Sequence, residues 1–252
     1  MTSPRKTSYL FDTLSRLDMA GASEFDRRLV LSDGSLPEQS ETEVRAIYTK
    51  SGLGWPTEVY PGPSGTRIAF WRAFKIAYER GFDRVLIVED DITPCKNALR
   101  YINSFSVPDD LAFVSFFEMK ELNSTDQYGL HDLGLFQFPR MKTRMYCGNQ
   151  CMLIPRRTLE YLVACDPSDP ELPADRWIVP ASSSDCVMGW HLSRSPWPRY
   201  GGLMPNLVQH IGEVSSLPEY STLEGRLSAC FPGEDFDAMT LPQNPTRYIL
   251  TF

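Results

Sequence analysis

Long hydrophobic runs are missing from the chain, and their absence narrows the class of protein. No stretch of the 252 residues approaches the roughly 18 uninterrupted apolar residues that a membrane-spanning helix needs. The first residues, MTSPRKTSYLF, lack the apolar stretch and the small-residue cleavage site of a signal peptide. We therefore expect a protein with no membrane partner that is located in the cytoplasm.

Paired cysteine motifs are also missing. The six cysteines form no CxxC pair, and no histidine lies at zinc-finger spacing from them. Because disulfides are rare in the reducing cytosol, we expect the cysteines to be free thiols.

The chain has no excess of basic residues. Its 25 lysines and arginines and 32 aspartates and glutamates leave a formal net charge of −7, whereas proteins that bind nucleic acid through phosphates need basic surfaces. One local exception is a basic cluster formed by Arg140, Lys142, Arg144, Arg156 and Arg157. This cluster is either a solvated face or a surface for DNA, and the sequence leaves both open.

Two kinds of apolar pattern alternate along the chain. Short β-rich runs predict strands at residues 28–32, 84–88, 111–117 and 151–154. Helical spacing predicts helices at residues 7–17, 66–80, 93–105 and 155–163 and from Ser184 onward. Such alternation predicts a single α/β domain over residues 1–252, with a mostly parallel central sheet flanked by helices.

Three functional parts are expected within this domain. We expect residues 1–120 to bind a nucleotide-derived ligand and residues 121–217 to carry the catalytic half. Residues 36–65, 121–140 and 166–183 are expected to be mostly loop, and residues 218–252 an irregular tail.

The strongest local signal is VLIVEDD at residues 85–91, in which a buried strand ends in Glu89, Asp90 and Asp91. Three adjacent carboxylates repel one another, and a cation relieves the repulsion. Oxygen ligands of this kind suit Mg²⁺ or Mn²⁺, which bind one or two carboxylates together with substrate phosphates. An acidic loop that faces water is the alternative reading.

Two later residues are further candidates. His210 lies in PNLVQHIGEVSSL, residues 205–217, where a lone histidine has either a structural or a ligand role. Asp185 lies in SSSDCVMGWHL, residues 182–192, in the first turn of an expected helix. The helix dipole alone favours an acid there, so Asp185 is either a capping residue or a catalytic base.

Together these segments resemble GT-A glycosyltransferases, whose fold is Rossmann-like. VLIVEDD resembles their DxD-type motif, PNLVQHIGEVSSL the late segment that closes the donor site, and SSSDCVMGWHL the segment that supplies the acceptor-activating acid in inverting members. TSPRKTSYLFDTLSRLDMAG, residues 2–21, and ACFPGEDFDAMTL, residues 229–241, resemble a small bacterial and phage family of these enzymes.

The resemblance implies a role for each candidate. Asp91 and His210 would hold the metal, and Asp185 would be the base of an inverting transfer. The implied donor-binding residues are Arg5 and Asp33 for the nucleoside, Glu89 and Asp90 for the ribose or sugar, and Gly148 and Asn149 for the sugar pocket.

The expected function is therefore a glycosyltransferase that depends on Mn²⁺ or Mg²⁺ and moves a sugar from a nucleotide-sugar, with a UDP-sugar favoured. The resemblance leaves the acceptor open among a hydroxymethylated pyrimidine in DNA, a glycan and a small molecule. A nucleotidyltransferase on the same class of fold and a non-catalytic binding protein are the alternatives.

Overall fold

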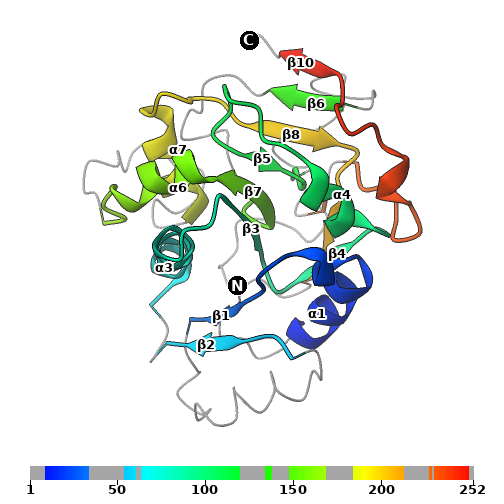
Figure 1. The fold of residues 1–252 in the computed structure, drawn as a ribbon, viewed down its shortest axis with the longest axis horizontal. Helices are drawn as coiled ribbons and strands as arrows, with labels where there is room; N and C mark the ends of the chain where they lie inside the picture. The colour runs from blue at the N-terminus through cyan, green and yellow to red at the C-terminus, as the bar shows by residue number, and fades with distance from the viewer. Residues whose placement is uncertain are drawn as a thin grey trace.

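Helices and strands alternate along the computed structural model, which describes residues 9–33, 54–60, 64–119, 134–137, 148–168, 184–212, 227–228 and 230–249 (Figure 1). Its helices are α1 (Leu10–Met19), α3 (Thr66–Glu79), α4 (Ala98–Ser104), α6 (Arg156–Val163) and α7 (Ser184–Ser193), with short 3₁₀ turns η1 (Ala22–Glu24) and η4 (Ala238–Thr240). Its strands are β1 (Val30–Ser32), β2 (Thr57–Val59), β3 (Arg84–Val88), β4 (Ile92–Pro94), β5 (Val114–Ser115), β6 (Gly134–Gln137), β7 (Cys151–Pro155), β8 (Gly201–Met204), β9 (Val208–His210) and β10 (Arg247–Ile249).

A six-stranded sheet in the order β10-β6-β8-β5-β7-β3 forms the centre, and the pairs β1–β2 and β4–β9 are separate. The α/β class agrees with the sequence, but the strand directions are more mixed than predicted. The pairs β10–β6, β5–β8 and β1–β2 are parallel, whereas β3–β7, β5–β7, β6–β8 and β4–β9 are antiparallel. Strands buried on both faces have the same apolar composition whichever way their neighbours run, so composition could not reveal direction.

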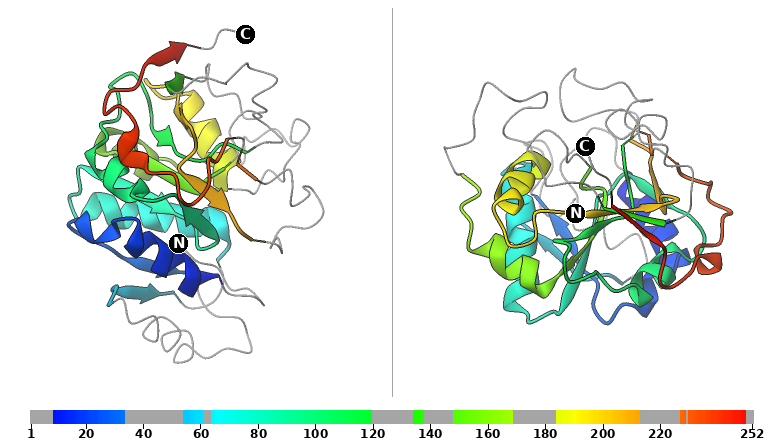
Figure 2. Two further views of the ribbon diagram at one scale, coloured as in Figure 1. Left: turned by 90° about the vertical axis from the view of Figure 1, so that its right-hand side faces the viewer. Right: turned by 90° about the horizontal axis from the view of Figure 1, so that it is seen from above.

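Helices cover both faces of this sheet, with α3, α6 and α7 on one side and α1 and α4 on the other (Figure 2). Alternate residues of β3 serve the two faces: Leu86 and Val88 pack in the core beside α1 and α4, and Val85 and Ile87 pack beside α3 and α6. Burial on both faces explains why this strand is a continuous apolar run. No helix in the described ranges is long and apolar enough to cross a membrane.

The segment after the acidic residues differs from the sequence prediction. Thr93 and Pro94 belong to strand β4 rather than to the start of a helix, because Ile92–Pro94 pairs with β9. The helix begins later, at Ala98, and its expected core residues Leu99, Ile102 and Phe105 are buried as predicted. Distant pairing has thus overridden a local capping signal.

Three further strands were missing from the prediction or differ from it. β6 lies within the expected loop at residues 121–140, and β10 adds an edge strand from the part expected to be an irregular tail. β8, a glycine-rich segment in which no strand was expected, pairs with both β5 and β6. Conversely, β3 was expected in the centre of a parallel sheet, but it lies at one end of the six-stranded order.

Candidate active site

The acidic segment at residues 89–91 leaves the carboxyl end of β3 and turns inward. Asp90 and Asp91 are only 3% and 4% exposed, so the segment is not a loop facing water. Thr13 of α1 fixes its backbone, because the Thr13 hydroxyl lies 2.8 Å from the carbonyl of Asp90 and 3.0 Å from that of Ile92. No pattern in the sequence predicts this support from α1.

Asp91 and His210, which are far apart in the sequence, meet in the structure. The Nε2 atom of His210 lies 3.1 Å from Oδ2 of Asp91, and both side chains are about 5% exposed. The β4–β9 ladder produces this contact, because it places Ile92 opposite His210 and is extended by a 2.8 Å hydrogen bond from the Ile211 N–H to the Asp91 carbonyl. The predicted pairing of these two residues is therefore present in the geometry.

Gly212 lies directly against the Asp91–His210 pair. A Cβ atom at residue 212 would lie 2.6 Å from Oδ2 of Asp91 and 2.9 Å from Cε1 of His210. Both distances are below van der Waals contact, so a glycine is the residue that the arrangement accommodates. The only sequence signal for it was its place two residues after the histidine.

One nitrogen of the His210 imidazole makes no hydrogen bond to the described residues. Its Nδ1 is buried and has no hydrogen-bond partner among the described residues. When Nε2 carries the proton and donates to Asp91, Nδ1 presents a bare lone pair. In the other tautomer Nδ1 carries the proton and can donate to a ligand, while Nε2 presents its lone pair beside Oδ2 of Asp91, where the two atoms can hold a cation together.

The segment at residues 148–150 lies beside the acidic segment and connects it to α7. The Glu89 N–H donates to the carbonyl of Gln150 over 3.0 Å, and the Asn149 amide donates to the Ser184 hydroxyl over 2.8 Å. The side-chain oxygens of Asn149 and Gln150 are buried without a hydrogen-bond partner in the described structure. These oxygens can accept hydrogen bonds from hydroxyl groups of a ligand.

Gly148 allows this segment to turn. Its φ of +123° is one that side chains rarely adopt, and an added Cβ would lie 3.2 Å from the ring of Phe117. The predicted sugar-pocket residues Gly148 and Asn149 thus lie next to the acidic segment.

Asp185 enters the same neighbourhood through Ser184 at the start of α7. Its Oδ1 accepts a 3.0 Å hydrogen bond from the N–H of Cys186, and the residue is half-buried. This contact matches the first-turn role that the sequence left open. No described contact joins Asp185 to Asp91 or His210.

Asp33 has a structural role that the sequence did not indicate. Its buried carboxylate accepts hydrogen bonds from the N–H groups of Ser64, at 3.1 Å, and Gly65, at 2.8 Å, and from the Ser64 hydroxyl. Arg72 lies 3.5 Å away. Asp33 therefore fixes the start of α3, and no contact within the described part of the chain joins it to the acidic segment. Arg5 lies outside the described residues.

Glu118 is a buried acid that the sequence reading missed. It is 0% exposed and follows β5, which runs in the same direction as β3 because both are antiparallel to β7. With neighbouring strands about 4.8 Å apart, β3 and β5 are about 10 Å apart across β7. The Glu118 N–H donates to Asn206, and the Tyr200 hydroxyl lies 3.4 Å from its carboxylate. The only available signal was an acid at the end of an apolar strand.

Metal ligands are few in this region. Among the described residues, no group of three or more histidines, cysteines, aspartates or glutamates could hold a metal ion. Burial raises the pKa of the Cys95 thiol to about 12 and raises that of Cys151 further. Both therefore remain neutral thiols rather than thiolate ligands. Any cation here would be held by Asp91 and His210 together with oxygens of a ligand or water.

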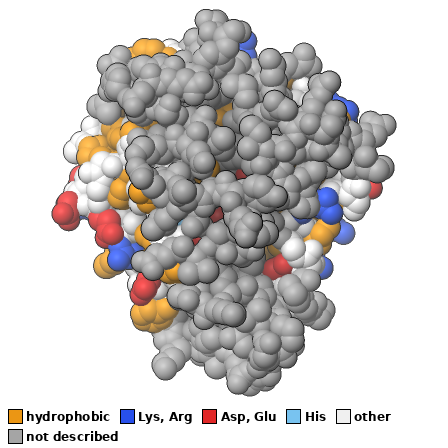
Figure 3. Space-filling view, turned by 180° about the vertical axis from the view of Figure 1, so that it is seen from behind, with side chains coloured by type: hydrophobic (Ala, Val, Ile, Leu, Met, Phe, Trp, Pro, Cys, Tyr) orange, Lys and Arg blue, Asp and Glu red, His pale blue; other side chains and the backbone are white. Residues whose placement is uncertain are grey.

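Two arginines of the basic cluster have partners within the fold. Arg156 packs over the ring of Tyr78, and Arg157 donates to the carbonyls of Pro108 and Leu111. The other members, Arg140, Lys142 and Arg144, lie outside the described residues. On the face drawn in Figure 3, acidic, basic and hydrophobic side chains are interspersed among the coloured residues.

Comparisons with known proteins give no family for the chain. No protein family matches it, and no curated protein matches it. Among solved structures, A197 from STIV is 13% identical with a TM-score of 0.36, over 84% of this chain and 96% of A197. A cytidylyltransferase from Leptospira borgpetersenii is 14% identical with a TM-score of 0.34, over 66% of this chain and 63% of that one. Likenesses this distant say nothing about the reaction.

Proposed function

We propose that the protein is a glycosyltransferase that uses a nucleotide-sugar and a divalent cation. One observation carries the proposal: the buried Asp91–His210 pair at the carboxyl end of β3. The acceptor-type side-chain oxygens of Asn149 and Gln150 belong to the segment whose backbone is hydrogen-bonded to Glu89, and they supply sites for sugar hydroxyls. The resemblance of the acidic segment to the DxD-type motif supports the same reading.

The Asp91–His210 pair fits a cation by its distances and chemistry. Two adjacent ligands of an octahedral ion, each about 2.1 Å from the metal, lie about 3.0 Å apart. The observed 3.1 Å between Nε2 and Oδ2 agrees with this separation. An imidazole nitrogen beside a carboxylate suits Mn²⁺ better than Mg²⁺, which prefers oxygen.

In this proposal each of the site residues has a distinct role. Asp91 and His210 hold the cation, which when bound offsets the charge of a departing diphosphate. Glu89 and Asp90 orient the donor's ribose or sugar, and Asn149 accepts a sugar hydroxyl. Asp185 takes the proton of the acceptor hydroxyl, which makes the transfer inverting. Burial of the pair strengthens its electrostatic effect because water is excluded.

Release of a nucleoside diphosphate tests this function. The protein is incubated with Mn²⁺ and a panel of nucleotide-sugars that includes UDP-sugars, and release of the nucleoside diphosphate is measured. Asp91→Asn and His210→Gln are each expected to lose at least about 100-fold of the activity, since even outer-shell changes cost 10–100-fold. Glu79→Gln, an exposed change on α3 that removes only an ion pair with Lys75, is the matched control. Pyrophosphate release from a nucleoside triphosphate would instead identify a nucleotidyltransferase.

The base and the acceptor need separate tests. Asp185→Asn should abolish transfer while donor binding stays intact, and near-normal transfer would leave Asp185 only its role in the first turn of α7. For the acceptor, hydroxymethylated DNA is compared with neutral glycans at rising salt. Transfer to DNA should weaken steeply with salt, whereas transfer to a neutral glycan should barely change.

A further inference from the structure

The hydroxyl of Thr13 bonds outside its own helix. A threonine within a helix can donate to a carbonyl three or four residues earlier. Thr13 of α1 instead donates to two carbonyls that are 77 and 79 residues away, that of Asp90 over 2.8 Å and that of Ile92 over 3.0 Å. The hydroxyl has one proton, so the two oxygens share it. Thr13 is only 1% exposed, so water does not compete for this contact.

These two carbonyls lie on either side of Asp91, and the carbonyl of Asp91 itself has a donor from another element. The Ile211 N–H, directly after β9, donates to it over 2.8 Å. Each residue has only two soft backbone torsions, which are set by the peptide groups before and after it. Fixing the carbonyls of residues 90 and 91 therefore fixes φ and ψ of Asp91. These torsions decide the direction in which the Asp91 side chain leaves the backbone.

The Asp91 carboxylate tolerates little movement of its backbone. Its Oδ2 lies 3.1 Å from Nε2 of His210, close to the separation of about 3.0 Å between adjacent ligands of an octahedral ion. A Cβ added at Gly212 would lie only 2.6 Å from the same oxygen. A shift of the backbone at residue 91 therefore changes the spacing of the pair or presses the carboxylate against residue 212.

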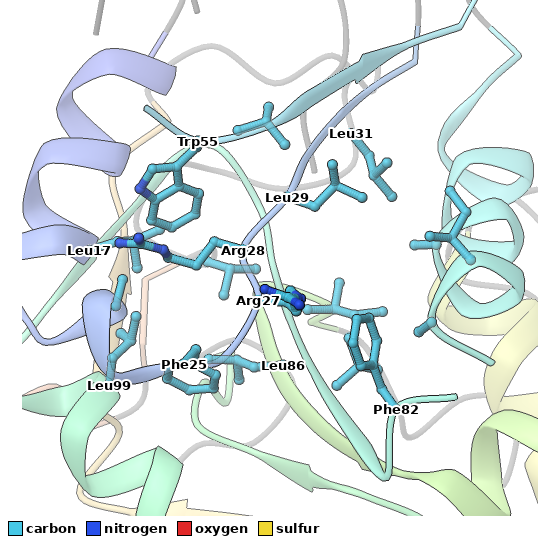
Figure 4. A pocket seen from close by; sticks show the side chains of 18 of the residues that line it. Leu17, Phe25, Arg27, Arg28, Leu29, Leu31, Trp55, Phe82, Leu86 and Leu99 are labelled. Atoms are coloured by element: carbon cyan, nitrogen blue, oxygen red, sulfur yellow. The ribbon is translucent and has the colours of Figure 1, made fainter. Parts of the chain in front are cut away.

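Packing leaves the acidic segment open on one side. A cavity of about 600 Å³ lies between α1 and β3, and Thr13 and Asp90 both line it. Figure 4 shows Leu17 of α1 and Leu86 of β3 among the side chains on its wall. Close packing is what holds protein interiors rigid, so a segment beside a cavity relies more on directed hydrogen bonds. The hydrogen bond from Thr13 is of this kind.

Helix α1 is a firm support for this hydrogen bond. One turn after Thr13, Leu17 packs in the same core cluster as Ile92. Between them, Nη1 of Arg16 donates to the Thr93 hydroxyl over 2.8 Å. The helix therefore holds the chain after Asp90 by apolar and polar contacts together.

We propose that Thr13 is a positioning residue, whose hydroxyl sets the direction of Asp91 and thereby the geometry of the Asp91–His210 pair. The inference rests on the proposed function, because the direction of Asp91 affects activity only if Asp91 is a ligand. A threonine with a purely structural role would contribute to stability alone. A positioning threonine also sets the affinity for Mn²⁺ and the surroundings of the His210 ring.

Thr13→Val tests the hydroxyl, because valine replaces it with a methyl group of similar size. Thr158→Val is the matched control: Thr158 is 0% exposed and donates to the Ala112 carbonyl over 2.6 Å in α6. Both changes should lower the thermal midpoint, but only Thr13→Val should weaken Mn²⁺ binding, by about 10–100-fold. Paramagnetic resonance titration with Mn²⁺ measures the affinity. Wild-type affinity in Thr13→Val, or an equal loss in Thr158→Val, would overturn the proposal.

Two further substitutions at Thr13 separate the hydroxyl from the fold. Thr13→Ser keeps the donor and should bind Mn²⁺ close to wild type. Thr13→Cys has the shape of serine but a weak S–H donor, so it should bind Mn²⁺ more weakly than Thr13→Ser. This pair carries the comparison if Thr13→Val does not fold, and equal affinity in the two would overturn the proposal.

Magnetic resonance of the His210 ring distinguishes failure of this inference from failure of the proposed function. The chain has three histidines, so His210→Gln assigns the ring protons. In metal-free protein these resonances should shift in Thr13→Val and stay in place in Thr158→Val. If they do so while the wild type binds no Mn²⁺, the positioning role stands and the proposed function fails. If the wild type binds Mn²⁺ but Thr13→Val changes neither resonances nor affinity, the positioning role fails and the proposed function stands.

Discussion

Replacing Gly212 with alanine perturbs the site by a single methyl group. The new Cβ would lie 2.6 Å from Oδ2 of Asp91, 2.9 Å from Cε1 of His210 and 3.2 Å from its Nε2. Gly212 is not among the glycines with a positive φ, so its backbone accepts alanine without strain. Any effect of Gly212→Ala therefore comes from displacement of the Asp91–His210 pair.

The expected magnitudes follow from these contacts. The carboxylate must move by more than half an ångström to reach an ordinary contact distance, and misplacement on the order of 1 Å can cost about 100-fold in rate. Changes next to metal ligands cost about 10–100-fold in affinity. Overpacking of a buried position costs about 1–3 kcal/mol of the free energy of unfolding. We expect weaker Mn²⁺ binding and slower transfer by these factors in a protein that still folds.

Calorimetric Mn²⁺ titration, diphosphate release and denaturant unfolding measure the three effects of Gly212→Ala. Gly54→Ala is the control, because its added Cβ meets nothing within 4 Å while its φ of +63° strains the backbone. The control should lose about 1 kcal/mol of stability without any change in Mn²⁺ affinity. Wild-type Mn²⁺ affinity and activity in Gly212→Ala would refute the reasoning about the pair.

Three further outcomes are expected. Asp33→Asn should lower the free energy of unfolding by about 1–3 kcal/mol in urea, because the buried carboxylate caps the start of α3; an unchanged midpoint would contradict that role. Hydrogen bonds from the Asn97 side chain and then from the Met239 N–H lower the pKa of Asp237 below 3.8. The ionised Asp237 therefore stabilises the folded protein above that pH, and this stabilisation is lost as the pH falls through the lowered pKa. Thermal midpoints of wild type and Asp237→Asn should therefore differ near neutral pH and converge in acid. Cys95 and Cys151, whose thiol pKa values are raised by burial, should resist iodoacetamide at pH 8 until the protein unfolds, and mass spectrometry of the folded protein would reveal any earlier labelling.

Local patterns in the sequence predicted those elements whose contacts are local. The helix at residues 66–79 and the strands at residues 84–88 and 151–155 match their apolar spacing closely. Strand β4 could not be predicted, because Thr93 and Pro94 look like a helix start and pair instead with residues more than 100 positions away. The direction of β7 was equally hidden, since its burial is the same in either orientation.

The candidate site was predictable in part. The acidic segment and His210 carried chemical signals, and the structure brings Asp91 and His210 together. Thr13 and Glu118 were missed, because a threonine on a helix and an acid after a strand have no distinctive spacing. Asp33 was assigned to a nucleoside, although in the structure its carboxylate binds the backbone at the start of α3, a contact that depends on folding.

Binding of Mn²⁺ in the presence of UDP tests the central claim most directly. Paramagnetic resonance titrations would compare the wild type with Asp91→Asn, His210→Gln and the double variant. If both residues hold one ion, each single change should weaken binding at least about 100-fold, and the double variant should be little weaker than either single one. Wild-type affinity in both single variants would contradict the claim that this pair is a cation site.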